Sequence, residues 1–129
     1  MNIVLYQPEI PYNTGNIGRS CVLTNTTLHL IKPLGFSLDE KQVRRAGMDY
    51  WHLVDLKIWE SFEEFLEANR NIRLFYATTK TKQKYSDVKY GENDFIMFGP
   101  ESRGIPEEIL NANPERCITI PMIPMGRSL

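Results

Sequence analysis

Short apolar runs alternate with helical patterns along almost the whole chain, and this alternation constrains its fold more than any other feature. Six runs are rich in β-forming residues, at 2–6, 28–31, 53–56, 73–77, 95–98 and 117–120. Helical patterns lie between them at 15–23, 37–46, 61–69 and 106–110. This alternation predicts βαβ units and a mainly parallel sheet. Because several strands are apolar without interruption, we expect an α/β fold with helices on both faces of the sheet.

Polar residues mark where these helices begin. Asn13 or Thr14 is expected to cap the first helix with its side chain. Residues 37–40 and 61–64 both have the spacing of a capping box, in which a serine is followed three positions later by glutamate. The capping signals therefore agree with the alternating pattern.

Length and composition favour one ordinary domain over residues 1–129. The formal net charge of −1 does not indicate a general nucleic-acid binder, so any such binding needs a local patch. Cys21 and Cys117 are far apart in apolar settings, and we expect both to be reduced, buried thiols of a cytoplasmic protein. No export signal, membrane span or zinc-like Cys/His set is visible, so we expect neither membrane nor metal binding.

The densest local signal is the segment at residues 99–106, which directly follows the apolar run at 95–98. It combines two glycines, two prolines, a carboxylate at Glu101 and a guanidinium at Arg103. Open α/β sheets bind ligands where strands end in such loops and helices begin. An ordinary turn with solvated charges is the alternative, but the concentration of these residues after a buried strand favours a ligand-binding loop.

Two other segments follow predicted strands. Asn13, Asn16 and Arg19 are expected at the start of the first helix, where an anion is favoured. Taken alone, that segment is better explained as a cap plus a surface arginine. Residues 118–129 are apolar and punctuated by prolines, which is unusual for a chain end, although an edge strand followed by a frayed end is the alternative.

A lysine-rich stretch at 79–93 is expected to be a long polar loop. Lys80 and Lys82 lie in it together with Tyr85 and Tyr90. Cations mixed with aromatic rings hold phosphates and stack on bases, although most stretches of this kind are simply solvated.

Considered together, these segments resemble the SpoU branch of the SPOUT RNA ribose 2'-O-methyltransferases. The resemblance covers nearly the whole chain, through residues 2–11, 13–19, 44–50, 98–104 and 120–122. Each motif is weak by itself, whereas their order and spacing are specific. Within the family, the chain is most similar to small enzymes that methylate the wobble-position ribose of tRNA, on cytidine or uridine.

The resemblance implies a single SPOUT domain with a deep trefoil knot near the carboxyl end, a rare exception to unknotted topology. It implies S-adenosylmethionine as methyl donor, S-adenosylhomocysteine as product, a homodimer, and the tRNA anticodon loop as partner. In the family the third motif continues into an asparagine, a serine and a long helix. The chain stops at Leu129, so we expect that last helix to be missing from it.

By position in the family motifs, the resemblance also implies roles for individual residues. The catalytic groups are expected to be Asn13, Arg19, Glu101 and Arg127. The cofactor pocket is expected to contain Ala77, Gly99, Ile120 and Ser128. RNA is expected to contact Arg19, Lys80, Lys82 and Arg103.

Methyl transfer to a ribose hydroxyl also requires removal of its proton. A guanidinium stays protonated in proteins, which makes it a poor base. We therefore expect Arg19 to bind the adjacent RNA phosphate and the developing oxyanion, while that phosphate or a water accepts the proton. Glu101 is expected to fix its loop or to orient Arg19.

Two other functional classes remain open at this point. One is a non-catalytic RNA-binding module that keeps the SPOUT fold, which would not need the methyl donor. The other is a small-molecule α/β enzyme of flavodoxin type, which the missing phosphate fingerprint disfavours.

Overall fold

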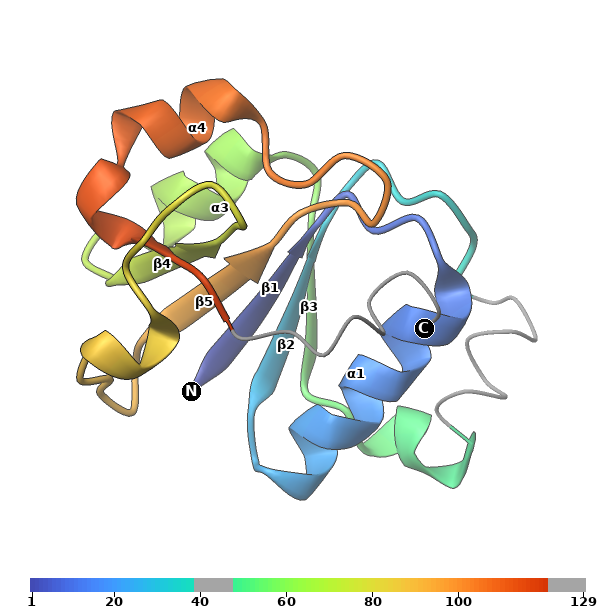
Figure 1. Ribbon diagram of the computed structural model, residues 1–129. Coiled ribbons are helices and arrows are strands. Elements are labelled where there is room, and N and C mark those ends of the chain that lie inside the picture. The colour runs from blue at the N-terminus through green and yellow to red at the C-terminus, as the bar shows by residue number, and fades with distance from the viewer. Residues whose placement is uncertain (39–47, 121–129) are drawn as a thin grey trace.

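The computed structural model describes residues 1–38 and 48–120, which form a parallel sheet flanked by helices (Figure 1). The strands, in the order β3-β2-β1-β5-β4-β6, are all parallel to their neighbours. Their bounds are β1 Asn2–Tyr6, β2 Thr27–Ile31, β3 Leu56–Trp59, β4 Leu74–Ala77, β5 Phe95–Phe98 and β6 Cys117–Ile118. The helices are α1 Pro11–Leu23, α3 Phe62–Ala68 and α4 Glu107–Ala112, with 3-10 turns η1 Met48–Leu53, η2 Tyr85–Asp87 and η3 Pro114–Arg116. The predicted mainly parallel α/β sheet is confirmed.

Successive strand residues point to opposite faces of the sheet, and helices cover both faces. Val4 and Met97 lie in a cluster with side chains of α3 and α4. Leu5 and Leu30 lie in a second cluster with α1 and η1. Figure 1 shows α1 in front of the strands and α3 and α4 on the other side. Because the apolar side chains of each strand alternate between the two faces, helices cover both faces of the sheet, as predicted.

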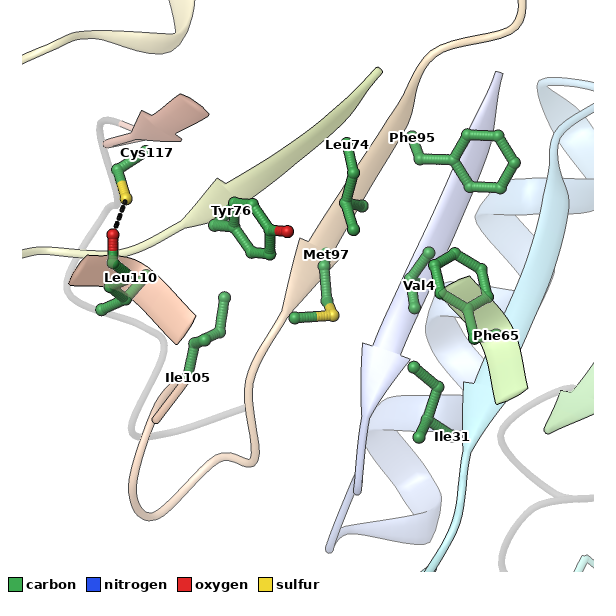
Figure 2. Close-up of a cluster of buried hydrophobic side chains, with 10 residues drawn as sticks. All are labelled: Val4, Ile31, Phe65, Leu74, Tyr76, Phe95, Met97, Ile105, Leu110 and Cys117. Carbon is green, nitrogen blue, oxygen red and sulfur yellow. Dashed lines mark hydrogen bonds between the residues drawn. The ribbon is translucent and has the colours of Figure 1, made fainter. Parts of the chain in front are cut away.

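The larger cluster extends beyond the sheet to the loop after β5. Figure 2 shows Ile105 of that loop in the same cluster as Tyr76 and Met97. Ile105 is only 4% exposed. Burial of an isoleucine side chain stabilises a fold by about 1.5–3 kcal/mol, so this residue anchors the end of the loop in the core.

The first helix begins earlier than predicted. It starts at Pro11, and Ile10 is the N-cap without a side-chain hydrogen bond. Proline suits the first helical position because its fixed φ fits and its missing N–H would have no partner there. The predicted cap at Asn13 or Thr14 is therefore wrong, since both residues lie inside the helix.

The third strand also differs from the prediction of 53–56. Leu53 ends η1, and β3 begins at Leu56, which pairs with Leu28. Asp55 belongs to the connection, where its carboxylate accepts a hydrogen bond from the Thr27 hydroxyl at 2.7 Å. Because β3 is an edge strand with an exposed centre, its apolar pattern is too weak to fix its limits.

The remaining elements agree with prediction to within a few residues. The Ser61 hydroxyl accepts a hydrogen bond from the Glu64 N–H at 3.0 Å, as the predicted cap requires. Cys21 and Cys117 are both buried with free thiols. The helix predicted over 37–46 lies almost entirely outside the described residues. Within the described residues, no helix is both long enough and apolar enough to span a bilayer.

Candidate functional site

The carboxyl ends of the central strands meet at one edge of the sheet, as in other parallel α/β proteins. Loop 7–10 follows β1 and loop 99–106 follows β5, and Figure 1 shows these two loops side by side. The segments after β4 and β6 reach the same edge, because the ends of those strands pair in parallel register. Segments far apart in sequence are thereby brought together.

A pocket of about 230 Å³ lies between the ends of β4, β5 and β6. Its lining residues are Ala77, Thr78, Thr79, Lys80, Phe98, Arg103, Gly104, Ile105, Thr119 and Ile120. Two residues predicted for the cofactor, Ala77 and Ile120, are among them. Two residues predicted for RNA, Lys80 and Arg103, also line this pocket, so an apolar wall and two cations lie next to each other.

Gly99, which is predicted to line the cofactor pocket, is not among the residues that line this pocket, but it shapes the pocket wall. A Cβ atom on Gly99 would lie 2.3 Å from the backbone carbon of Gly104 and the nitrogen of Ile105. Gly104 has a φ of +73°, a left-handed conformation that glycine adopts readily. The two glycines allow loop 99–106 to fold back on itself, which places Gly104 and Ile105 against the pocket.

Glu101 holds its loop against the start of α1. Its carboxylate accepts hydrogen bonds from the backbone N–H groups of Glu9 at 2.8 Å and Ile10 at 3.1 Å. These bonds match one of its two expected roles, the fixing of the loop. Its hydrogen bonds within the described residues do not include one with Arg19.

Arg19 lies elsewhere than predicted. It is eight residues after Pro11, or roughly 12 Å along the helix axis, so its predicted place at the helix start is wrong. Its guanidinium carbon lies 5.1 Å from the centre of the Tyr50 ring, a cation–π contact. Arg19 is exposed and does not line the pocket, whereas Asn13 lies in the first turn of α1.

The basic residues near the pocket differ in their surroundings. Lys80 forms an ion pair with Glu107, and its hydrogen bond lowers the pKa of that carboxyl below the ordinary value. Arg103 donates to the side-chain oxygen of Gln7 at 3.4 Å. Lys82 is exposed and does not line the pocket.

The segment after β6 is held on both sides. On one side, the Thr78 N–H donates to the Ile118 carbonyl at 2.9 Å. On the other, the Thr119 N–H donates to the Gln83 carbonyl and the Tyr85 N–H donates to the Thr119 carbonyl, both at 2.8 Å. The chain at 117–119 therefore passes between β4 and residues 83–85. The loop predicted over 79–93 is partly ordered, because it contains η2.

Several features of the site were not predicted from the sequence. Glu9 and Gln7 contact loop 99–106, and Tyr50 contacts Arg19, yet no local pattern distinguishes these residues from surface groups. Arg127 and Ser128 lie outside the described residues. Across residues 1–38 and 48–120 no group of three or more acidic, histidine or cysteine side chains could hold a metal ion.

The fold and the site define a class, a parallel α/β protein with its pocket at the carboxyl edge of the sheet. The chain matches the SpoU rRNA Methylase family over residues 1–129, and it belongs to that family.

Relatives and solved structures agree with this assignment. The tRNA (cytidine(34)-2'-O)-methyltransferase of Aeromonas hydrophila is 52% identical over all of this chain and 83% of its own length. A structure described as "Structural insights into the 2-OH methylation of C/U34 on tRNA" is 45% identical, with a TM-score of 0.89 over 94% of this chain and 79% of that one. The SpoU methyltransferase AviRb from Streptomyces viridochromogenes in complex with AdoMet is 17% identical and shares the fold, with a TM-score of 0.80 over 95% of this chain and 49% of that one.

Proposed function

We propose that this chain is a tRNA 2'-O-methyltransferase that transfers a methyl group from S-adenosylmethionine to the ribose of nucleotide 34, a cytidine or a uridine. Similarity over all of this chain and 83% of a relative with this named activity supports the substrate. The observation that carries the proposal is the pocket between β4, β5 and β6, which is lined by Ala77, Gly104 and Ile120. S-adenosylhomocysteine is the product.

The pocket residues suit the proposed cofactor. The side chains of Ala77, Ile105 and Ile120 offer apolar walls for a flat adenine ring, and Gly104 lets the ligand approach the backbone closely. When bound, S-adenosylmethionine supplies an electrophilic methyl group. Lys80 and Arg103 are exposed cations of the same pocket, and they suit the phosphates of an RNA beside it.

Arg19 is proposed to bind the RNA phosphate next to the target ribose and to stabilise the developing oxyanion. Among the described residues, no carboxylate lies within ion-pair distance of Arg19, so its charge is available to an anion. The Asn13 side chain has no hydrogen-bond partner among the described residues, and it lies on the same helix. These groups would align the ribose oxygen, and alignment alone can lower a barrier substantially. The proton of the ribose hydroxyl passes to the phosphate or to a water.

The remaining features of the resemblance are proposed at the level of the whole chain. We propose one SPOUT domain over residues 1–129, a trefoil knot, a homodimer and a cytoplasmic location. The passage of residues 117–119 between β4 and residues 83–85 supports the knot, because threading needs a loop on either side of the chain. Arg127 and Ser128 remain proposed members of the site from their position in the family motif.

Titration calorimetry with S-adenosylmethionine tests the proposed cofactor. The wild-type chain is expected to bind it, and Ile120→Asp should weaken binding at least tenfold, because a carboxylate would enter an apolar wall. Ile58→Asp is the matched control, since Ile58 is 41% exposed on the edge strand β3. A wild-type chain that binds tRNA but not S-adenosylmethionine would instead be a non-catalytic RNA-binding module.

Single-turnover methylation with Arg19→Lys tests the proposed role of Arg19. A lysine keeps the charge but loses the planar fork that grips phosphate. We expect weaker tRNA binding with nearly normal chemistry at saturating tRNA if Arg19 only anchors a phosphate, and a slower chemical step if it also stabilises the oxyanion. Normal binding together with a normal rate would remove Arg19 from the mechanism.

A further inference from the structure

We propose that Glu9 is a positioning residue, which together with Glu101 and Ser102 forms a reciprocal lock that keeps loop 99–106 in the shape required by the cofactor. The inference rests on the proposed function, because it assigns S-adenosylmethionine to the pocket beside that loop. The three residues are called the loop lock below.

In the loop lock, the carboxylate of each loop accepts hydrogen bonds from the other loop. Glu101 accepts hydrogen bonds from the backbone N–H groups of Glu9 at 2.8 Å and Ile10 at 3.1 Å. In return, Glu9 accepts from the backbone N–H of Ser102 at 2.8 Å and from the Ser102 hydroxyl at 2.9 Å. The two loops are more than ninety residues apart in sequence, so these bonds are wholly tertiary.

The like charges of the lock are compensated by donors around them. The backbone N–H of Ser102, followed by its hydroxyl, holds the pKa of Glu9 below the ordinary value, and Arg103 acts in the same direction. The Arg103 Nε atom lies 3.9 Å from a Glu9 oxygen. Glu9 therefore acts as an acceptor in its ionised form at neutral pH.

The lock acts on the exposed part of the loop, which lies between two anchored ends. Gly99 continues directly from β5, and Ile105 is buried in the core. Between them, residues 101–104 are exposed, and the turn closes with a hydrogen bond from the Gly104 N–H to the Pro100 carbonyl at 2.8 Å. The lock fixes Glu101 and Ser102, and the next two residues line the pocket.

A strained residue on the other loop belongs to the same arrangement. Gln7 has a φ of +49°, a left-handed conformation that is uncommon outside glycine. Its side chain accepts the hydrogen bond from Arg103. Such strain persists where surrounding contacts over-determine the backbone, and the lock supplies such contacts two residues away.

The expected effect of the lock is on binding more than on overall stability. Its hydrogen bonds lie at an exposed edge, so losing them should leave the buried core intact. If the loop then adopts the binding shape only one-tenth of the time, the apparent dissociation constant for S-adenosylmethionine rises tenfold.

The test compares variants by calorimetry with S-adenosylmethionine, by thermal unfolding and by steady-state kinetics. Glu9→Ala should raise the dissociation constant and the KM for S-adenosylmethionine about tenfold, with kcat at saturation within about twofold of wild type. Glu9→Gln should stay within about threefold, because its amide oxygen still accepts from Ser102. Glu92→Ala is the matched control, since Glu92 is an exposed carboxylate before β5, at the opposite edge of the sheet.

The double variant Glu9→Ala/Glu101→Ala separates a lock from two independent contacts. Because both residues hold the same pair of loops, the double variant should bind no more than about twofold worse than Glu9→Ala alone. Ser102→Ala removes only the hydrogen bond from the Ser102 hydroxyl to Glu9. Its dissociation constant should lie between those of the wild type and Glu9→Ala.

Three results would overturn the inference. The first is a dissociation constant for Glu9→Ala within twofold of the wild-type value. The second is a double variant whose increase in dissociation constant equals the product of the two single increases. The third is that the variants bind more weakly only to the extent that they are thermally less stable. If the wild-type chain does not bind S-adenosylmethionine, the proposed function and the lock are both overturned. If the wild-type chain and Glu9→Ala bind it equally well, only the lock is overturned.

Discussion

Gly99 and Gly104 lie in one loop, yet the structure needs glycine at the two positions for different reasons. At Gly99 a side chain would collide with backbone atoms 2.3 Å away. At Gly104 nothing lies within 4 Å of the added atom, and only the φ of +73° opposes substitution. The sequence shows both glycines but not this difference, because it depends on how the loop folds back.

Alanine substitutions should separate the two cases. Gly104→Ala is expected to lower the free energy of unfolding by about 1 kcal/mol, the cost of a left-handed alanine. Gly99→Ala is expected to lower it by about 3 kcal/mol and to abolish cofactor binding, because the backbone of the loop must move. Urea unfolding measures both values, and equal costs would contradict the assigned roles.

His29 is a buried neutral group with both ring nitrogens engaged. The Trp59 N–H donates to its Nδ1 at 3.0 Å, so its Nε2 carries the hydrogen that is donated to the Asn2 side-chain oxygen, also at 3.0 Å. Burial, and to a lesser degree the charge of Lys57, lowers the pKa of His29 from 6.5 to about 4. The residue is therefore part of the core.

The lowered pKa predicts a loss of stability in mild acid. Between about pH 6.5 and pH 4 the unfolded chain binds a proton at His29 that the folded chain does not, so stability falls as the pH falls through this window. We expect the free energy of unfolding to drop by about 1–2 kcal/mol from pH 7 to pH 5.

Urea unfolding at several pH values tests this expectation. His29→Gln is the comparison, because glutamine offers both a donor and an acceptor but does not titrate. Its stability should change less over the same range, and equal pH dependence in the two proteins would refute the role of His29.

At the scale of elements, helix α1 shows what local patterns can and cannot predict. Its existence and its carboxyl end were predicted, but its start was placed four residues late because Asn13 and Thr14 are good caps. That error also placed Arg19 at the start of the helix, whereas Arg19 lies in the third helical turn. The contact with Tyr50 depends on η1 packing against α1, where the Trp51 ring comes within 2.7 Å of the Cβ position that Gly18 leaves empty.

Strand β6 has only two residues, yet hydrogen bonds hold the segment around it on both sides. The Gln83 side chain adds further bonds to the carbonyls of Glu115 at 3.1 Å and Cys117 at 2.9 Å. We expect the amide hydrogens of Thr119 and Tyr85 to exchange slowly despite the short strand. Gln83→Ala should speed their exchange about thirtyfold, since two hydrogen bonds of about 1 kcal/mol net each are lost.

Hydrogen exchange measured by NMR tests this expectation, with Lys82→Ala as the control in the same loop. Fast exchange at Thr119 and Tyr85 in the wild-type protein would mean that residues 83–85 do not hold the segment. The proposed knot would then lose its main support.

At the scale of the molecule, the alternating pattern was enough to predict a parallel α/β sheet with helices on both faces. It could not supply the strand order, since pairing such as Phe95 with Asn2 joins residues far apart in sequence. The pocket residues Ala77 and Ile120 followed from the family resemblance, which places whole motifs. Glu9 was not singled out, because its partner Ser102 is ninety-three residues away and no local signal links the two.

The proposed activity depends on one atom of the substrate, the 2'-oxygen of nucleotide 34. The most direct measurement incubates the chain with methyl-labelled S-adenosylmethionine and two tRNAs that differ only in having ribose or 2'-deoxyribose at that nucleotide. We expect label to enter the ribose-containing tRNA at nucleotide 34 and not to enter the deoxy substrate. Equal labelling of both tRNAs, or no labelling when both the cofactor and tRNA are bound, would contradict the proposed function.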